Sequence, residues 1–294
     1  MRTTMSHKKR FYLAVVLGLL GANASNASAA QGLYGPDYPG VKFTQKLFGE
    51  DRLYFRLGAI YMSPDVKTNS ITLSNLSEIA EVAVEPGEQE GDAFSDPLTI
   101  PAATIGYKLR WGAWGGGWSL ETMAAMPPTL ELKAKGRIAD VPLVTEANGI
   151  PTGVPALGEK VAETKVAPPM VTLVKRFRNE RNFRPYAGLG VVYLFTYDSH
   201  VTNPILTEVG EPELEIENKF GWVGQVGVDW RMTDYWWLAA DFKYISVKDV
   251  SATVERTFIR APGLPQYQYA EVGDAEFNAD MNVYAFSLGV GFTF

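Results

Sequence analysis

The last thirteen residues, Asn282–Phe294, alternate between two kinds of side chain, and this pattern constrains the fold more than any other. One face is large and apolar and consists of Tyr284, Phe286, Leu288, Val290, Phe292 and Phe294. The other face is small and consists of Val283, Ala285, Ser287, Gly289, Gly291 and Thr293. A period of two residues predicts a β-strand. An apolar face with aromatic residues near its end is typical of a strand that faces lipid.

Composition excludes several other classes of protein. The hydrophobic fraction of the 294 residues is 46%, which is ordinary for a globular protein and too low for a bundle of membrane helices. The chain has no cysteine, so a disulfide framework and thiolate metal sites are excluded. We expect no metal, no cofactor and no catalytic residues.

The N-terminus has the features of a cleaved secretory signal peptide over residues 1–29. Lys8–Arg10 are basic, residues 11–22 are apolar but too few to span a bilayer, and Ala27–Ala29 predict a cleavage site. An uncleaved anchor helix is the alternative. Cleavage removes four of the 27 basic residues and leaves 33 acidic ones, so the mature net charge is about −10. This charge argues against nucleic acid as a partner.

Alternation recurs in seven further segments of about ten residues, the length that a tilted strand needs to cross a bilayer. Together with the closing strand they predict an all-β fold, an eight-stranded antiparallel transmembrane β-barrel over residues 53–294. The register of the fourth segment is ambiguous. The seven segments cover residues 53–61, 103–111, 118–130, 167–177, 189–197, 220–230 and 236–244. Residues 30–52 contain prolines and glycines and are predicted to form a periplasmic segment outside the barrel wall.

The connections between these segments alternate in length. Short connections cover residues 112–117, 178–182 and 232–234, and long ones cover 63–97, 131–166, 199–218 and 248–276. This pattern fits an outer-membrane barrel with short periplasmic turns, long extracellular loops and both termini in the periplasm. The long loops are rich in acidic residues. Solvated loops without a specific task are the simplest interpretation, and binding of divalent cations or adhesion is the alternative.

The residues that face the barrel interior differ in chemistry along its height. Near the short turns they are charged: Arg56, Lys108, Arg110, Glu121, Asp229, Arg231, Asp241 and Lys243. Near the long loops they are apolar: Ile60, Met62, Met123, Ala125, Val192, Leu194, Val223, Ile245 and Val283. Buried charges persist when they are paired, so we interpret the first set as a charged plug below an apolar funnel. The alternative is that both sets only fill space.

Two pairs of prolines face each other across one predicted hairpin. Pro127 and Pro128 end the third segment, and Pro168 and Pro169 begin the fourth. Proline cannot donate a hydrogen bond to a neighbouring strand, so these residues predict an interruption of pairing near the upper rim. We interpret this interruption as a lateral opening in the wall, and ordinary strand termination is the alternative.

Four sequence stretches are similar to those of a known family. They are Phe183-Arg184-Pro185-Tyr186-Ala187-Gly188-Leu189-Gly190, Pro168-Pro169, Gly224-Gln225-Val226-Gly227-Val228-Asp229 and Gly289-Val290-Gly291-Phe292-Thr293-Phe294. Over about residues 53–294 the chain resembles the outer-membrane protein W family, which includes alkane-uptake barrels. The resemblance implies a barrel in the Gram-negative outer membrane that passes small apolar molecules through its wall into the membrane. It also implies that the barrel-assembly machinery reads the closing strand that ends in Phe294.

Three functions remain open at this point. The first is passive uptake of small hydrophobic molecules, with outer-membrane lipids and an apolar solute as partners. The second is a barrel enzyme, but the mature chain has one histidine, His200, and its neighbour Ser199 points to the opposite face of a strand, so the two form no dyad. The third is a structural or adhesive surface barrel with an inert interior.

Overall fold

The computed structural model describes residues 52–75, 87–88, 92–140, 142, 146–147, 150–178, 181–233, 235–263 and 269–293. The predicted signal peptide, the segment up to residue 51 and Phe294 lie outside this part of the chain. The chain divides into a small unit, Met1–Tyr54 with Thr293–Phe294, and a large unit, Phe55–Phe292. In the small unit the hydroxyl of Thr293 donates a hydrogen bond to the carbonyl of Leu53 at 3.3 Å.

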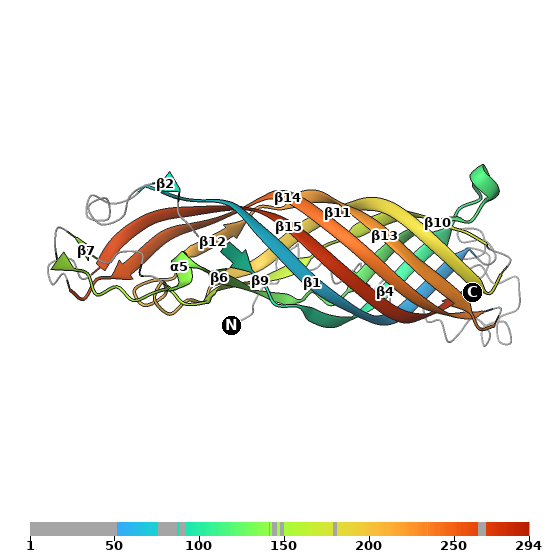
Figure 1. Cartoon of the computed structure of the whole chain (residues 1–294), viewed down its shortest axis with the longest axis horizontal. Helices are drawn as coiled ribbons and strands as arrows, with labels where there is room; N and C mark the ends of the chain where they lie inside the picture. The colour runs from blue at the N-terminus through green and yellow to red at the C-terminus, as the bar shows by residue number, and fades with distance from the viewer. Residues whose placement is uncertain are drawn as a thin grey trace, which may run out of the picture. The chain divides into compact units, whose positions relative to one another are not determined.

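Eight antiparallel strands form a closed ring, which confirms the predicted barrel (Figure 1). Each strand pairs with the next along the chain, β10 pairs with β11 as well as with β5, and the last strand pairs with the first. The eight strands are β1 (Leu53–Ser74), β4 (Leu98–Lys108), β5 (Trp118–Ala125), β10 (Met170–Arg176), β11 (Phe183–Val201), β13 (Lys219–Arg231), β14 (Trp236–Arg260) and β15 (Tyr269–Thr293).

Shorter strands extend the wall at one end of the ring. β3 (Asp92–Phe94) precedes β4, β6 (Thr129–Lys135) follows β5, β9 (Lys160–Ala167) precedes β10, and β12 (Glu213–Ile216) precedes β13. β2 (Gly87–Glu88) pairs with β1, and β7 (Glu146–Ala147) pairs with β8 (Ile150–Pro151). In the part of the chain that the structure describes, the helical elements are η2 (Ala113–Gly115) and α5 (Arg137–Asp140). No helix among the described residues is long and apolar enough to cross a membrane.

The outer surface of the ring carries a belt of exposed apolar side chains. Leu57, Leu189 and Leu288 are 53%, 69% and 57% exposed. Leucine side chains in the core of a soluble protein are far more deeply buried. Aromatic contacts bound the belt at both ends. Tyr193–Phe220 and Tyr244–Tyr284 lie at one end, with ring centroids 4.6 and 5.4 Å apart, and Trp236–Phe292 lies at the other at 5.4 Å. An apolar belt between two aromatic girdles is the lipid-facing surface of an outer-membrane barrel.

The strands continue well beyond this belt, which corrects the predicted loop boundaries. β14 has 25 residues, about 80 Å of strand, whereas a bilayer needs about ten residues. β1, β14 and β15 therefore occupy parts of the stretches 63–97 and 248–276 that the sequence predicts as loops. The prediction relied on large apolar residues facing outward. Beyond the upper girdle this preference inverts, because the outer face is in water and the apolar residues point inward.

Two glycines allow the first and last strands to close the ring. A Cβ atom on Gly58 would lie 2.0 Å from the carbonyl oxygen of Leu288, and one on Gly289 would lie 2.6 Å from the carbonyl oxygen of Leu57. Real Cβ atoms do not approach a backbone oxygen so closely. The seam between β1 and β15 therefore requires glycine at both positions.

Candidate functional site

Six charged side chains meet inside the lower part of the barrel. Their side chains are between 1% and 11% exposed, and they come from five different strands. They are the acids Glu121, Asp229 and Asp241 and the bases Arg56, Arg176 and Lys243. Three negative and three positive charges balance, which is the condition under which buried charges persist.

Glu121 is the centre of this charged network. Its carboxylate accepts hydrogen bonds from the guanidinium of Arg56, from Nη2 of Arg176 at 2.7 Å and from the amide of Gln225 at 3.0 Å. Nε of Arg176 donates in turn to Asp229 at 2.8 Å. Strands β1, β5, β10 and β13 are thus connected across the interior through one carboxylate.

Tyr186 connects the rest of the network. Its hydroxyl donates to Asp241 at 2.7 Å and accepts from Arg56 at 2.5 Å. The guanidinium carbons of Arg56 and Arg176 lie 5.4 and 5.2 Å from the centre of its ring, within the range of cation–π contacts. Lys243 forms an ion pair with Asp241. The network therefore spans the lower interior from β1 to β14.

The charged residues predicted from sequence fall into two groups. Arg56, Glu121, Asp229, Asp241 and Lys243 meet in the network, as described above. Lys108 and Arg110 are exposed instead. β4 ends at residue 108 and the turn to β5 follows at once, so neither side chain reaches the interior. Arg231 is half-buried at the end of β13.

Two central members of the charged network, Arg176 and Tyr186, are not predicted from the sequence. Arg176 lies on the segment whose register was ambiguous, and its pairing with Tyr186 on β11 fixes that register. Leu189 and Val191 on β11 face lipid. Because side chains alternate between the two faces of a strand, Gly188 and Tyr186 face the interior. A search for inward aromatic residues with polar ends would have pointed to it.

Apolar side chains cover the charged network from above. The pair Val223–Ile245 is the next inward pair along β13 and β14 after Gln225–Lys243. The buried cluster consists of Leu130, Val166, Met170, Val192, Leu194, Val223, Ile245, Val247 and Val250, with Met123 and Val283 packed against it. Of the predicted apolar lining, Ile60 is also buried, whereas Met62 is half-buried and Ala125 is exposed.

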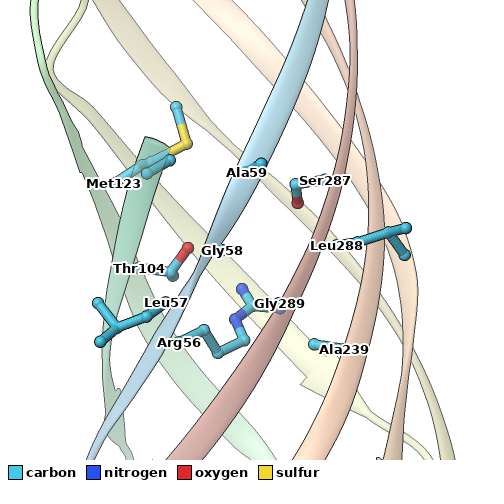
Figure 2. A pocket seen from close by; sticks show the side chains of 11 residues that line it. Arg56, Leu57, Gly58, Ala59, Thr104, Met123, Ala239, Ser287, Leu288 and Gly289 are labelled. Atoms are coloured by element: carbon cyan, nitrogen blue, oxygen red, sulfur yellow. The ribbon is translucent and has the colours of Figure 1, made fainter. Parts of the chain in front are cut away.

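A small void marks the change from charged to apolar chemistry (Figure 2). It has a volume of about 20 Å³ and lies against Arg56, Thr104, Met123 and Ser287. Figure 2 shows the Arg56 guanidinium at one side of this void and Met123 further along the strands, while Leu57 points away from it. The void is too small for a solute larger than water.

A much larger cavity, here called the chamber, lies inside the extended part of the wall. Its volume is about 220 Å³. Leu130, Val166 and Leu194 belong both to its lining and to the apolar cluster below it. Its wall continues through Ile71, Leu73, Ala162, Ile216, Val250, Ala252, Val254, Phe277, Ala279 and Met281. Two charged residues, Lys133 and Asp92, also border the chamber; the ammonium group of Lys133 pairs with Asp96 at 2.5 Å, and Asp92 is exposed. The chamber is therefore suited to apolar molecules.

Loop residues close the chamber at its far end. Leu157 and Leu206 line the chamber and pack in a second cluster with Val154, Val201, Ile259 and Ala261. Asn203, which is fully buried, holds the two loops together. Its side-chain amide donates to the carbonyl oxygens of Leu157 and Lys160, both at 2.8 Å. A molecule that enters the chamber from this end has to pass these loops.

The wall is interrupted beside the lower end of the chamber. Pairing between β5 and β10 ends at Thr122–Val171, and pairing between β6 and β9 begins at Thr129–Lys165. Pro127–Pro128 and Pro168–Pro169 lie in this interval. On the other side of the same strand, pairing ends at Ala102–Ala125 and resumes at Phe94–Lys133. Among the described residues, the third strand therefore lacks ladder partners between Ala125 and Lys133 on the side of β3 and β4, whereas on the other side the amide of Val166 donates to the carbonyl of Pro128 at 3.1 Å.

The interruption lies level with the upper aromatic girdle. The carbonyl of Pro169 accepts a hydrogen bond from the amide of Tyr193 at 3.0 Å, and Tyr193 pairs with Phe220 in the girdle. Met126, beside the prolines, is 70% exposed. The girdle marks the boundary between lipid and water, so the unpaired part of the wall faces the membrane interface.

Comparison with known proteins identifies the family. Residues 50–294 match the sequence model of the OmpW family. The chain belongs to the OmpW family. Membership confirms the predicted resemblance and places this barrel in the outer membrane of a Gram-negative bacterium.

Two relatives and one solved structure illustrate the degree of similarity. The chain is 33% identical over 95 residues to outer membrane protein W of Vibrio cholerae, a stretch covering 32% of this chain and 42% of that protein. It is 30% identical over 90 residues to the outer-membrane protein y4mB of Sinorhizobium fredii, covering 31% and 37%. The aligned stretches thus span less than half of either relative. The crystal structure of OprG from Pseudomonas aeruginosa matches with a TM-score of 0.61 at 19% identity, covering 83% of this chain and 96% of OprG, and shows the shared fold.

The described part of this OmpW-family chain brings Ser199 and His200 to opposite faces of β11. The hydroxyl of Ser199 lies 2.8 Å from that of Thr164, whereas the exposed His200 ring lies 4.0 Å from Glu163. The two side chains therefore do not form a nucleophile–base pair. No group of three or more histidine, aspartate or glutamate side chains in the described residues could hold a metal ion.

Proposed function

We propose that this OmpW-family barrel takes up small apolar molecules passively. The carrying observation is the apolar chamber of about 220 Å³, which ends above a charged floor at the height where the wall is interrupted. Transfer from water into the chamber is favourable for an apolar solute, because it removes apolar surface from water. No energy source is required.

The charged network makes the route straight down unfavourable. A solute that moved towards the periplasm would have to separate Glu121 from Arg56 and Arg176, and each unpaired buried charge costs several kcal/mol. An apolar solute offers these groups nothing in exchange. The lower barrel is thus a plug, as the sequence suggests.

The remaining exit is sideways. Among the described residues, the third strand has no ladder partner between Ala125 and Lys133 on the side of β3 and β4, so a molecule that passes between the strands there breaks no ladder hydrogen bond. The interruption is level with the girdle that includes Tyr193, so a solute that leaves there enters the lipid. We propose lateral release into the outer membrane at this position.

Single acidic substitutions test this proposal. Leu194→Asp and Ile60→Asp place a carboxylate on the buried apolar interior, and a buried unpaired charge strongly opposes an apolar solute. We expect about a tenfold or larger loss of uptake of an apolar fluorescent dye by cells. Val209→Asp adds the same charge at a residue that is 36% exposed and does not line the chamber, and it should leave uptake unchanged. Normal uptake by correctly folded Leu194→Asp protein would refute the proposal.

Two further expectations belong to this proposal. Uptake needs no catalysis, so the His200→Ala variant should retain it. Loss of uptake in a folded His200→Ala variant would instead favour the alternative of a barrel enzyme. The barrel-assembly machinery is the proposed partner of the closing strand, whose last residue, Phe294, lies outside the described residues. Deletion of Phe294 should lower the amount of folded protein in the outer membrane without changing uptake per folded molecule.

A further inference from the structure

Basic residues are concentrated at the short-turn end of the barrel, which is the periplasmic end in outer-membrane barrels. Residues 108–118 and 175–184, here called the basic rim, contain seven basic residues and one acidic residue, Glu180, which lies outside the described residues. In the whole chain acidic residues outnumber basic ones by 33 to 27. The two stretches are neighbours, because β5 pairs with β10 up to Trp118–Lys175. Positive charge therefore gathers on one side of the rim.

Three arginines of the basic rim are exposed and form no ion pair with another described residue. They are Arg110, Arg178 and Arg181. Exposed bases near the long loops differ in this respect. Lys165 pairs with Asp198 at 2.6 Å, and Arg260 pairs with Glu208 at 2.9 Å. The three arginines of the rim are therefore available to an anion from outside the chain.

A cluster of tryptophans forms part of the same rim. The rings of Trp111 and Trp114 lie 5.1 and 5.9 Å from the ring of Trp118. The ammonium group of Lys175 lies 5.4 Å from the centre of the Trp118 ring and donates to the carbonyl of Trp114 at 2.8 Å, which holds the turn against β10. Trp114 is nevertheless 85% exposed. Tryptophan is enriched at the level of the lipid headgroups, so this turn is suited to that level of the membrane.

The rim is continuous with the lipid-facing belt. Trp118 and Lys175 lie on the outer face of the wall, because they alternate with Leu120 and Val171, which are 41% and 49% exposed. A phospholipid whose acyl chains lie against this belt places its phosphate at the level of the two turns. This continuity favours a lipid over a soluble acidic protein as the partner of the rim.

We propose that the basic rim binds an anionic phospholipid of the periplasmic leaflet, with Arg110, Arg178 and Arg181 as the groups that attract its phosphate. A guanidinium group matches a phosphate with two parallel hydrogen bonds. A zwitterionic phospholipid also carries a phosphate, but the arginines repel its ammonium group. A basic residue near an anionic membrane surface strengthens binding about fivefold. This binding site is separate from the chamber and does not depend on uptake.

Native mass spectrometry of the barrel, purified from outer membranes in detergent, tests the inference. Phosphatidylglycerol and phosphatidylcholine with identical acyl chains are titrated separately, and the mass of each complex counts the bound lipids. We expect the wild-type barrel to bind phosphatidylglycerol about fivefold or more tightly than phosphatidylcholine. The combined variant Arg110→Gln, Arg178→Gln and Arg181→Gln should reduce this preference to less than about twofold, because the charge that separates the two headgroups is gone.

The matched control removes three bases near the long loops, each of which already has an acidic partner. It combines Lys248→Gln, Arg256→Gln and Arg260→Gln. The net charge of the chain changes by the same amount, so the control should keep the wild-type preference. Equal affinity of the wild type for the two lipids, an unchanged preference in the rim variant, or an equal loss in the control would each overturn the inference. Heat-modifiable migration in gels shows that each variant is folded.

Discussion

Among single substitutions in the charged network, we expect Glu121→Ala to destabilise the barrel most. The carboxylate is 2% exposed and accepts hydrogen bonds from Arg56, Arg176 and Gln225. Without it, Arg176 keeps Asp229, but Arg56 retains only the hydroxyl of Tyr186 among the partners described above. Removing one partner of a buried ion pair costs about 3–5 kcal/mol, because the other charge stays buried without compensation. We expect Glu121→Ala to lower the free energy of unfolding by that amount.

Urea unfolding of the barrel in phospholipid vesicles, followed by tryptophan fluorescence, measures this loss. Glu208→Ala is a matched control that breaks the ion pair with Arg260, whose side chains are 46% and 48% exposed, and it should leave the unfolding midpoint unchanged within error. Arg56→Met in the Glu121→Ala background removes the leftover charge. The double variant should therefore lose about 1–3 kcal/mol less than the sum of the single losses. Additive losses, or a Glu121→Ala variant as stable as the control, would refute the reasoning.

Three further changes test other parts of the barrel. Gly58→Val places atoms against the carbonyl of Leu288 and should cost more than the about 1–3 kcal/mol of ordinary overpacking, so that the heat-modifiable folded band disappears; normal folding would contradict the close seam. Replacing Pro127–Pro128 by two alanines restores backbone donors and should slow release of dye from the barrel into lipid, whereas an unchanged rate would argue against lateral exit. The backbone amide of Asp249 donates to Asp280 at 3.1 Å and holds the pKa of that carboxyl below its usual 3.8. The stabilisation from this hydrogen bond is complete above about pH 4 and is lost as the pH falls through the lowered pKa of Asp280. Amide hydrogen exchange at Asp249, relative to its intrinsic rate, should therefore accelerate at low pH in the wild type but not in the Asp280→Asn variant.

The membrane-spanning part of the fold could be predicted because lipid imposes a simple pattern. Each crossing needs an outward apolar face, and the large residues on that face, such as Leu189, Leu238 and Leu288, mark strand and orientation together. The prolines marked the interruption for an equally direct reason, since a residue without an amide proton cannot complete a ladder. These signals are local in sequence and need no knowledge of the partner strand.

The extended wall could not be predicted in the same way. Beyond the girdle the apolar face points inward and its residues are smaller, as with Ala252, Ala275 and Ala279. Bulges at Asp249 and Arg256, both with positive φ, also shift the alternation along β14. A fixed period of two therefore fails twice within one strand. Much of the chamber wall, including Ile71, Ala162 and Ala252, lies in stretches that the sequence predicts as loops.

The charged network is hard to predict from sequence for a different reason, because its members meet only through pairing between distant strands. Arg176 and Glu121 are 55 residues apart and meet only once the register of β10 against β5 is fixed. A one-residue slip would turn Arg176 to lipid, where an unpaired charge is costly. The same slip would turn Leu173 inward and remove an apolar side chain from the lipid face. Arg176→Leu should therefore destabilise the barrel more than Arg176→Lys, because only lysine keeps a cation facing Glu121 and Asp229. Equal losses of unfolding free energy for the two variants in urea would show that charge balance does not set this register.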